Sequence, residues 1–251
     1  MRVSVLSSGS KGNTTFVETD NTKILIDIGN TSKYVKEKLE DIGVKPESLD
    51  GILITHTHVD HIKGLKVFNK RYNVPTYITD KMHSAIDYLD NYKLLSDEFD
   101  IKDIHINVIK TSHDTEDSRG YVLTNNDSSI VYITDTGYIN KKYYDLLSNR
   151  NLYIMESNHD VEMLSNSSYP FNLRQRILSD KGHLSNYDSS KYLCSFIGEN
   201  TKYILLAHLS EENNTEELAY KTLVSKLNEE NIQFSNIIIT KQNIETELIS
   251  I

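Results

Sequence analysis

The chain has 251 residues, of which 38% are hydrophobic and 25% are charged, and its formal net charge is −9. This composition is ordinary for a soluble protein with a sizeable core, and the length predicts one large α/β domain over residues 1–251. The negative charge argues against a broad polyanion-binding surface, although two divalent ions in a cleft would add about four positive charges locally. No stretch approaches the roughly 20 apolar residues of a membrane helix, and the N-terminus lacks a signal-peptide pattern. The sequence therefore predicts a cytoplasmic protein with no membrane partner.

Short apolar runs that end in polar residues recur along the chain and are typical of buried strands. Segments with helical patterning lie between them and alternate with strands in the second half. This order predicts mixed sheets packed together, with helices outside. The expected strands are residues 2–6, 23–26, 51–55, 104–109, 129–134, 152–155, 203–207 and 237–239, and the expected helices are residues 32–41, 81–92, 141–148, 172–181, 188–198 and 216–228.

The loop at residues 7–13 follows the first expected strand and is rich in serine and glycine. Its backbone N–H groups could surround a phosphate, which makes Ser8, Ser10 and Asn13 candidate substrate contacts. The loop is not a P-loop, because the G-x-x-x-x-G-K-[ST] pattern is absent. A plain connecting turn is the alternative.

The most informative stretch is HTHVDH at residues 56–61, directly after the apolar run 51–55. In extended backbone His56 and His58 point to the same side, and Asp60 and His61 follow as the chain turns. One ion cannot easily take all four side chains from so short a segment. Two ions can share them, and bimetallic hydrolases hold their ions about 3.5–4 Å apart. A polar loop that is merely rich in histidine is disfavoured, because this spacing is specific.

Three later residues with metal-binding side chains also follow expected strands. His113 can complete a three-histidine set with two members of the 56–61 stretch, and His208 can join the other two. Asp135 can bridge two ions through its two carboxylate oxygens. Nitrogen and oxygen ligands of this kind permit Zn, Mn or Fe. The predicted ligands of two divalent ions are His56, His58, Asp60, His61, His113, Asp135 and His208.

These motifs and their order, with Asp27 first, resemble the metallo-β-lactamase superfamily over nearly the whole chain. The resemblance implies α/β architecture of the αββα sandwich type, with a dinuclear site at the sheet edges. It assigns Asp135 to the position between the ions, and it implies that Asp27 braces the metal loop by hydrogen bonds without binding metal. The implied ligands are His56, His58 and His113 for one ion, and Asp60, His61 and His208 for the other.

Four shorter motifs resemble the YycJ/WalJ branch of bacterial proteins, which is associated with 5′-to-3′ exonuclease activity on DNA. They are SSGSKGN at 7–13, ESNHD at 156–160, Tyr169-Pro170 and GHLSN at 182–186. A similarity to tRNase Z implies that His183 is an active-site residue that does not bind metal. The resemblance thus implies a dinuclear phosphodiesterase in which a metal-bound hydroxide attacks DNA, with Asp60 and His183 as catalytic residues.

Four further residues are candidate substrate contacts, each with an ordinary alternative. Glu156 and His159 could line the cleft, although His159 could also begin a solvated helix. Arg174 and Arg176 form a compact basic run near the 182–186 segment, where surface exposure is the alternative. His83 and His105 are expected to be packing or surface residues.

Two other functions use the same ligands. A glyoxalase-II-like thioester or lactone hydrolase would polarise a carbonyl with the ions, and the acidic surface favours such a small substrate. A regulatory protein that binds metal without catalysis is the other alternative. The intact ligand set argues against it.

Overall fold

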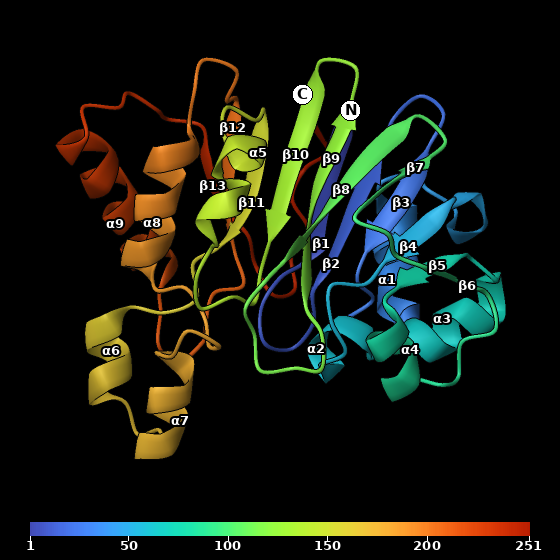
Figure 1. Cartoon of the computed structure of the whole chain (residues 1–251), viewed down its shortest axis with the longest axis horizontal. Helices are drawn as coiled ribbons and strands as arrows, with labels where there is room; N and C mark the ends of the chain where they lie inside the picture. The colour runs from blue at the N-terminus through green and yellow to red at the C-terminus, as the bar shows by residue number, and fades with distance from the viewer.

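Short β-branched runs form one seven-stranded sheet in the computed structural model, which describes residues 1–251 (Figure 1). The strand order is β14-β1-β2-β3-β4-β5-β6. Pairs from β14 to β3 are antiparallel, and pairs from β3 to β6 are parallel. The strands are β1 (Arg2–Ser7), β2 (Thr14–Glu18), β3 (Lys23–Ile26), β4 (Gly51–Leu53), β5 (Thr76–Ile78), β6 (Tyr92–Leu94) and β14 (Ile249–Ser250).

The second sheet repeats this plan with seven strands in the order β13-β12-β11-β10-β9-β8-β7. Its pairs are antiparallel from β7 to β10 and parallel from β10 to β13. Both sheets are therefore mixed, as the sequence predicts. The strands are β7 (Glu98–Ile101), β8 (Ile104–Lys110), β9 (Arg119–Asn125), β10 (Ser128–Ile133), β11 (Leu152–Glu156), β12 (Tyr203–Ala207) and β13 (Ile237–Ile239).

Helices cover the outer faces of both sheets (Figure 1). Side-chain caps fix the starts of several of them; for example, the oxygens of Thr31, Ser185 and Thr215 each accept a bond from a backbone N–H of the first turn. On the first sheet lie α1 (Ser32–Asp41), α3 (Leu65–Tyr72) and α4 (Asp80–Ala85), with α2 (Val59–Ile62) and the 3₁₀ turn η1 (Pro46–Ser48) nearby. The second half contributes η2 (Lys141–Tyr143), α5 (Tyr144–Leu147), α6 (Val161–Asn166), α7 (Phe171–Ile177), α8 (Asn186–Phe196) and α9 (Glu216–Glu229).

The buried apolar residues form three layers that correspond to this arrangement. The central layer fills the space between the sheets and includes Ile26, Tyr121 and Leu205. A second layer joins the first sheet to α1 and α3, and a third joins the second sheet to α8 and α9. The predicted αββα sandwich is confirmed. No helix combines the length and apolar character that crossing a bilayer requires.

The helix expected over residues 81–92 is wrong in its second half. The helix α4 ends at Ala85, and Ile86 and Leu89 are buried in turns rather than on a helix face. This lets Tyr92–Leu94 pair with β5 as the edge strand β6. The apolar residues spaced by three and four positions are buried, but they do not continue the helix. Pairing with a neighbouring strand overrides the helical pattern in this segment.

Candidate metal centre

The candidate site lies where strands of both sheets end, at the edge opposite the two chain termini (Figure 1). Asp27 follows β3, and His56 follows β4 after two residues. In the other sheet, Asp135 follows β10 after one residue, and His208 directly follows β12. Because these strands are the parallel part of each sheet, their carboxyl ends meet at one edge.

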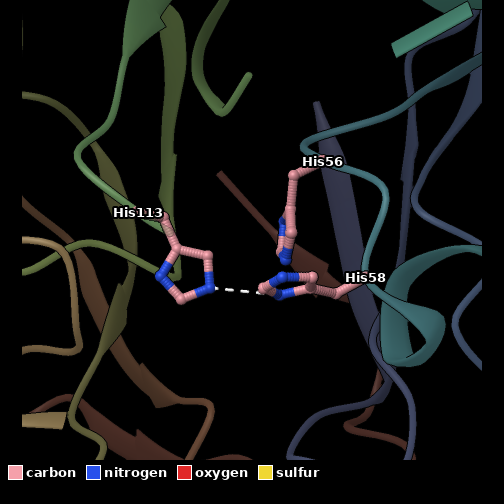
Figure 2. Close-up of side chains that lie close together, drawn as sticks. All are labelled: His56, His58 and His113. Atoms are coloured by element: carbon pink, nitrogen blue, oxygen red, sulfur yellow. Dashed lines mark hydrogen bonds between the residues drawn. The ribbon is translucent and has the colours of Figure 1, made fainter. Parts of the chain in front are cut away.

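One group of candidate ligands consists of three histidines whose rings point toward one another (Figure 2). One ligand atom from each of His56, His58 and His113 lies within 4.8 Å of the others. His113 Nε2 and His58 Nδ1 are 3.2 Å apart. His56 is completely buried, and its Nε2 has no hydrogen-bond partner.

A second group contains the other predicted ligands of the 56–61 stretch. Ligand atoms of Asp60, His61 and His208 lie within 4.8 Å of one another. The Oδ2 atom of Asp60 is 3.6 Å from Nε2 of both histidines. His208 Nε2 is buried without a partner.

Asp135 lies between these two groups. Its Oδ2 is 3.2 Å from His61 Nε2, and its Oδ1 is 3.7 Å from His113 Nε2. Burial opposes the charged form, but His208 and His61 outweigh it and hold the pKa of Asp135 well below its usual range. The side chain is therefore an anion that lies between the two groups of candidate ligands.

The donor set fits divalent metal ions. All candidate ligands offer nitrogen or oxygen, and three of these buried atoms, on His56, Asp135 and His208, lack any hydrogen-bond partner. Burying unpaired polar and charged atoms is costly unless a partner compensates them. Cations at the two groups would supply that partner.

Asp27 holds the metal loop in place from behind. Its Oδ1 accepts a bond from the Thr55 amide at 2.8 Å, and its Oδ2 accepts one from the Thr55 hydroxyl at 2.8 Å. The same Oδ2 lies 2.7 Å from His61 Nδ1. This bond places the proton of a neutral His61 on Nδ1 and leaves Nε2 free as a ligand atom.

Glu156 connects the two late histidines. Its Oε1 lies 2.7 Å from His183 Nδ1 and 2.9 Å from His208 Nδ1. Its Oε2 accepts bonds from the amides of Thr136 and Leu184, both at 3.1 Å. Burial would raise the pKa of Glu156, but the His183 charge and the hydrogen bonds with His183 and His208 lower it to about 2. Burial likewise opposes protonation of His183, whereas the Glu156 carboxylate raises its pKa overall.

The backbone is strained at three of these strand exits. Asp27, Asp135 and His208 have φ values of 62°, 55° and 56°, a region that non-glycine residues adopt at a cost of about 1–3 kcal/mol each. Strain of this size persists where the surrounding structure determines the conformation. Here it accompanies the turn of Asp27 toward His61 and of Asp135 and His208 toward the other candidate ligands.

Comparison with known proteins accounts for this arrangement. The profile of the Metallo-beta-lactamase superfamily matches residues 8–160. The chain belongs to this superfamily. It is 41% identical over 236 residues to the protein named Exodeoxyribonuclease WalJ of Streptococcus pneumoniae, with 90% of this chain and 88% of that one covered. It is 38% identical over 237 residues to the protein named Exodeoxyribonuclease YycJ of Bacillus anthracis, with 91% and 90% covered.

A solved structure supports the fold at lower identity. The metallo-beta-lactamase fold protein YhfI from Bacillus subtilis superposes with a TM-score of 0.73 at 18% identity, covering 98% of this chain and 99% of that one. The WalJ and YycJ proteins share both sequence and length with this chain. The expected membership of the YycJ/WalJ branch is confirmed.

Several residues expected to contact substrate are buried next to the candidate ligands. Ser8, Asn13 and Glu156 are at most 4% exposed. The Ser8 hydroxyl accepts a bond from the His208 amide at 2.8 Å, and the Asn13 amide group lies 3.1 Å from His61 Nε2. Both carboxylate oxygens of Glu156 already have hydrogen-bond partners. The placement favours positioning roles for these three residues over substrate contact.

The remaining expected contacts differ from one another. Ser10 is exposed on its loop, whereas His159 is 1% exposed and neither of its ring nitrogens has a partner. Arg176 pairs with Asp114, the residue after His113, and Arg174 donates to the Ser165 carbonyl. Both arginines therefore tie α7 to its surroundings, although the Arg176 side chain stays 56% exposed.

Sequence reasoning missed two contributors to the site. The Gly182 carbonyl lies 3.1 Å from His113 Nδ1 and so orients that ring. Thr55 donates two of the three bonds to the Asp27 carboxylate, yet the sequence pattern makes it the last residue of a strand. A backbone carbonyl leaves no trace in residue identity. His83 and His105 belong to none of the candidate ligand groups, in line with expectation.

Proposed function

We propose that this protein is a metal-dependent phosphodiesterase that degrades DNA from its ends in the 5′-to-3′ direction. The observation that carries the proposal is the identity of 38–41% to WalJ and YycJ over about 90% of the chain, with similar coverage of both relatives. The donor groups at the sheet edge support the same chemistry. The expected site of action is the cytoplasm, where such an enzyme would meet DNA.

In this proposal two divalent ions, Zn, Mn or Fe, occupy the centre. His56, His58 and His113 would hold one, Asp60, His61 and His208 would hold the other, and Asp135 would serve both. When bound, such ions acidify water and stabilise the negative charge that develops on a phosphodiester. Asp60 is the most exposed carboxylate among the ligands, which suits an additional contact with the water that reacts.

His183 would donate a proton to the leaving oxygen. Glu156 fixes the ring through Nδ1, and no hydrogen bond of the structure uses Nε2. The side chain is 21% exposed, whereas the His208 side chain is 3% exposed. His183 can therefore face a substrate while remaining oriented from behind, which suits a general acid near neutral pH.

The test is a panel of substrates given to protein reconstituted with each metal. End-labelled single- and double-stranded DNA and RNA, closed circular DNA, a thioester and a lactone would be compared, with Asp135→Ala as the inactive control. We expect cleavage of linear DNA, release of label from the 5′ end and no cleavage of closed circles. Efficient hydrolysis of the thioester or lactone with intact nucleic acids would overturn the proposal in favour of the glyoxalase-II-like alternative.

A further inference from the structure

A small polar cavity is lined in part by Ser112, the residue before the candidate ligand His113. Its volume is about 140 Å³, and its lining includes Lys110, Ser112, Tyr138, Asn140 and Lys142. Sites that enclose a whole small molecule measure roughly 300–1,000 Å³. This cavity therefore suits a single group of the size of a phosphate rather than a complete nucleotide.

The cavity is cationic in a protein that is acidic overall. Lys110 and Lys142 are exposed, and neither takes part in an ion pair with any carboxylate of the chain. The Lys142 ammonium lies 4.7 Å from the centre of the Tyr143 ring. Two uncompensated ammonium groups at one cavity, with the Ser112 hydroxyl and the Asn140 amide, form an anion site by charge and by hydrogen-bonding capacity.

The cavity is tied firmly to the metal-binding loops. Ser112 precedes His113, and its amide donates to the Thr136 hydroxyl at 3.0 Å. That hydroxyl donates to the Tyr138 carbonyl at 2.7 Å, and the Gly137 amide donates to the Ser112 carbonyl at 2.9 Å. Thr136 directly follows Asp135. The cavity and the two ligands His113 and Asp135 thus belong to one hydrogen-bonded unit.

The other wall is fixed in the same way. The Tyr143 hydroxyl accepts a bond from the Lys110 amide at 3.0 Å, and the Asn140 side chain accepts one from the Lys142 amide at 3.0 Å. Tyr138, another lining residue, is in contrast 41% exposed. A ring in this position offers a surface on which a base can stack.

We propose that Lys110 and Lys142 bind a backbone phosphate of the DNA strand next to the one that is cleaved, and that Tyr138 stacks on the adjoining base. This inference rests on the proposed function and names a subsite for its substrate. A strand carries a phosphate at every nucleotide, so a cationic cavity joined to the metal loops meets the neighbouring phosphate when the scissile one lies in the cleft. The acidic remainder of the surface would leave few other phosphate contacts.

The experiment compares Lys110→Ala/Lys142→Ala with Lys141→Ala, a neighbouring exposed lysine that does not line the cavity. The double variant should raise KM for single-stranded DNA about tenfold. Its affinity should also depend less steeply on salt, with the magnitude of the log–log slope smaller by about 0.7 for the lost phosphate contact. Hydrolysis of bis(4-nitrophenyl) phosphate, which has no neighbouring phosphate, should be unchanged. Lys110→Arg/Lys142→Arg should restore KM, and Tyr138→Ala should weaken binding about fivefold or more, whereas Tyr138→Phe should not.

Binding is measured separately, by fluorescence anisotropy of a labelled phosphorothioate strand that resists cleavage. If the wild type cleaves DNA and the double variant matches it in KM and in anisotropy, the subsite is overturned while the proposed function stands. Strand binding that depends on both lysines, without cleavage, would support the subsite and overturn the nuclease. If the wild type neither binds nor cleaves DNA, both the subsite and the proposed function are overturned.

Discussion

Asp135 is the side chain that lies between the two halves of the candidate metal centre. It is 2% exposed and approaches His61 with one oxygen and His113 with the other. We expect Asp135→Ala to bind fewer than two ions, with weaker occupancy at both positions, whereas Asp145→Ala on the exposed face of α5 should bind as the wild type does. Elemental analysis after reconstitution measures this directly. Two ions retained by Asp135→Ala would contradict its bridging position.

The two late histidines share Glu156 but should have separable roles. His208 is buried beside Asp60, whereas His183 is partly exposed. His208→Ala should lose the ion of the second group, and His183→Ala should keep both ions and lose turnover. Glu156→Gln should lower turnover about 10–100-fold, because it removes the charge that orients both rings. Metal content and kcat measured on the same samples distinguish these outcomes, and metal loss in His183→Ala alone would reverse the assignment.

His159 should make the stability of the protein depend on pH. Burial lowers its pKa from 6.5 to about 4 in the folded protein. As the pH falls below 6.5, the unfolded chain therefore takes up the His159 proton before the folded protein does. The stability that comes from neutral His159 is present above pH 6.5 and is lost as the pH falls to about 4. The total loss is on the order of 3 kcal/mol. Urea unfolding of His159→Gln across this range should show a flatter profile than the wild type.

The exposed His105 provides the control for that measurement. Its Nδ1 lies 2.8 Å from Asp100 on the protein surface, and its side chain is 45% exposed. His105→Gln makes the same substitution at an exposed position and supplies the reference profile. If His159→Gln keeps the wild-type slope of stability against pH, protonation of His159 does not contribute to the pH dependence.

At the scale of elements, the loop after β3 and the turn into α2 approach so closely that only glycine fits between them. A Cβ atom on Gly29 would lie 1.8 Å from the Asp60 carbonyl oxygen and 2.3 Å from the Asn13 amide nitrogen. Gly29→Ala must therefore displace the segment that carries Asp60 and His61. We expect lower metal content together with a Tm several degrees lower, measured by elemental analysis and calorimetry.

A second glycine provides the comparison. A Cβ atom on Gly43, after α1, would meet nothing within 4 Å, but its φ is 77°. Asparagine tolerates this region better than other residues, so Gly43→Asn should keep full metal content. Normal metal binding by Gly29→Ala would mean that the two segments can separate without cost.

The sequence predicts those elements whose signal is local. The helix Ser32–Asp41 and the strands Lys23–Ile26, Tyr203–Ala207 and Ile237–Ile239 have the expected bounds, because uninterrupted apolar runs or a capped helical pattern define them. The sequence does not predict the strands β2, β5, β6, β7, β9 and β14, and it places Tyr92 of β6 at the end of a helix. Their residues pair with neighbours that are distant or separated by a turn, and such pairing is not visible in a short window.

The candidate ligands could be predicted from the sequence because their signal is also local. The 56–61 spacing and the polar residues after strands are local features, whereas the positioning roles of Glu156 and Asn13 depend on long-range packing. Glu156 reaches His208 across 52 positions, and Asn13 reaches His61 across 48. Residue identity alone therefore favoured substrate contacts for these two side chains.

The whole molecule joins the two halves of the chain at the metal centre. The first sheet supplies Asp27 and the 56–61 stretch, and the second supplies His113, Asp135 and His208. The complete ligand set exists only when the sheets pack face to face. Ions that bind this set bind the folded state and not the unfolded chain, so their binding energy adds to stability.

Removal of metal should therefore lower the thermal stability. An ion present at 100 times its Kd contributes about 2.7 kcal/mol, so two ions contribute about 5 kcal/mol. For a chain of this length that corresponds to a Tm lower by about 10–20 °C. Calorimetry of the reconstituted protein before and after chelation measures this shift, and readdition of metal should restore it. Asp135→Ala should respond weakly to the same treatment, because it has less bound metal to lose. An unchanged Tm in wild-type protein from which elemental analysis shows both ions removed would mean that the two sheets hold the site in its folded geometry without metal.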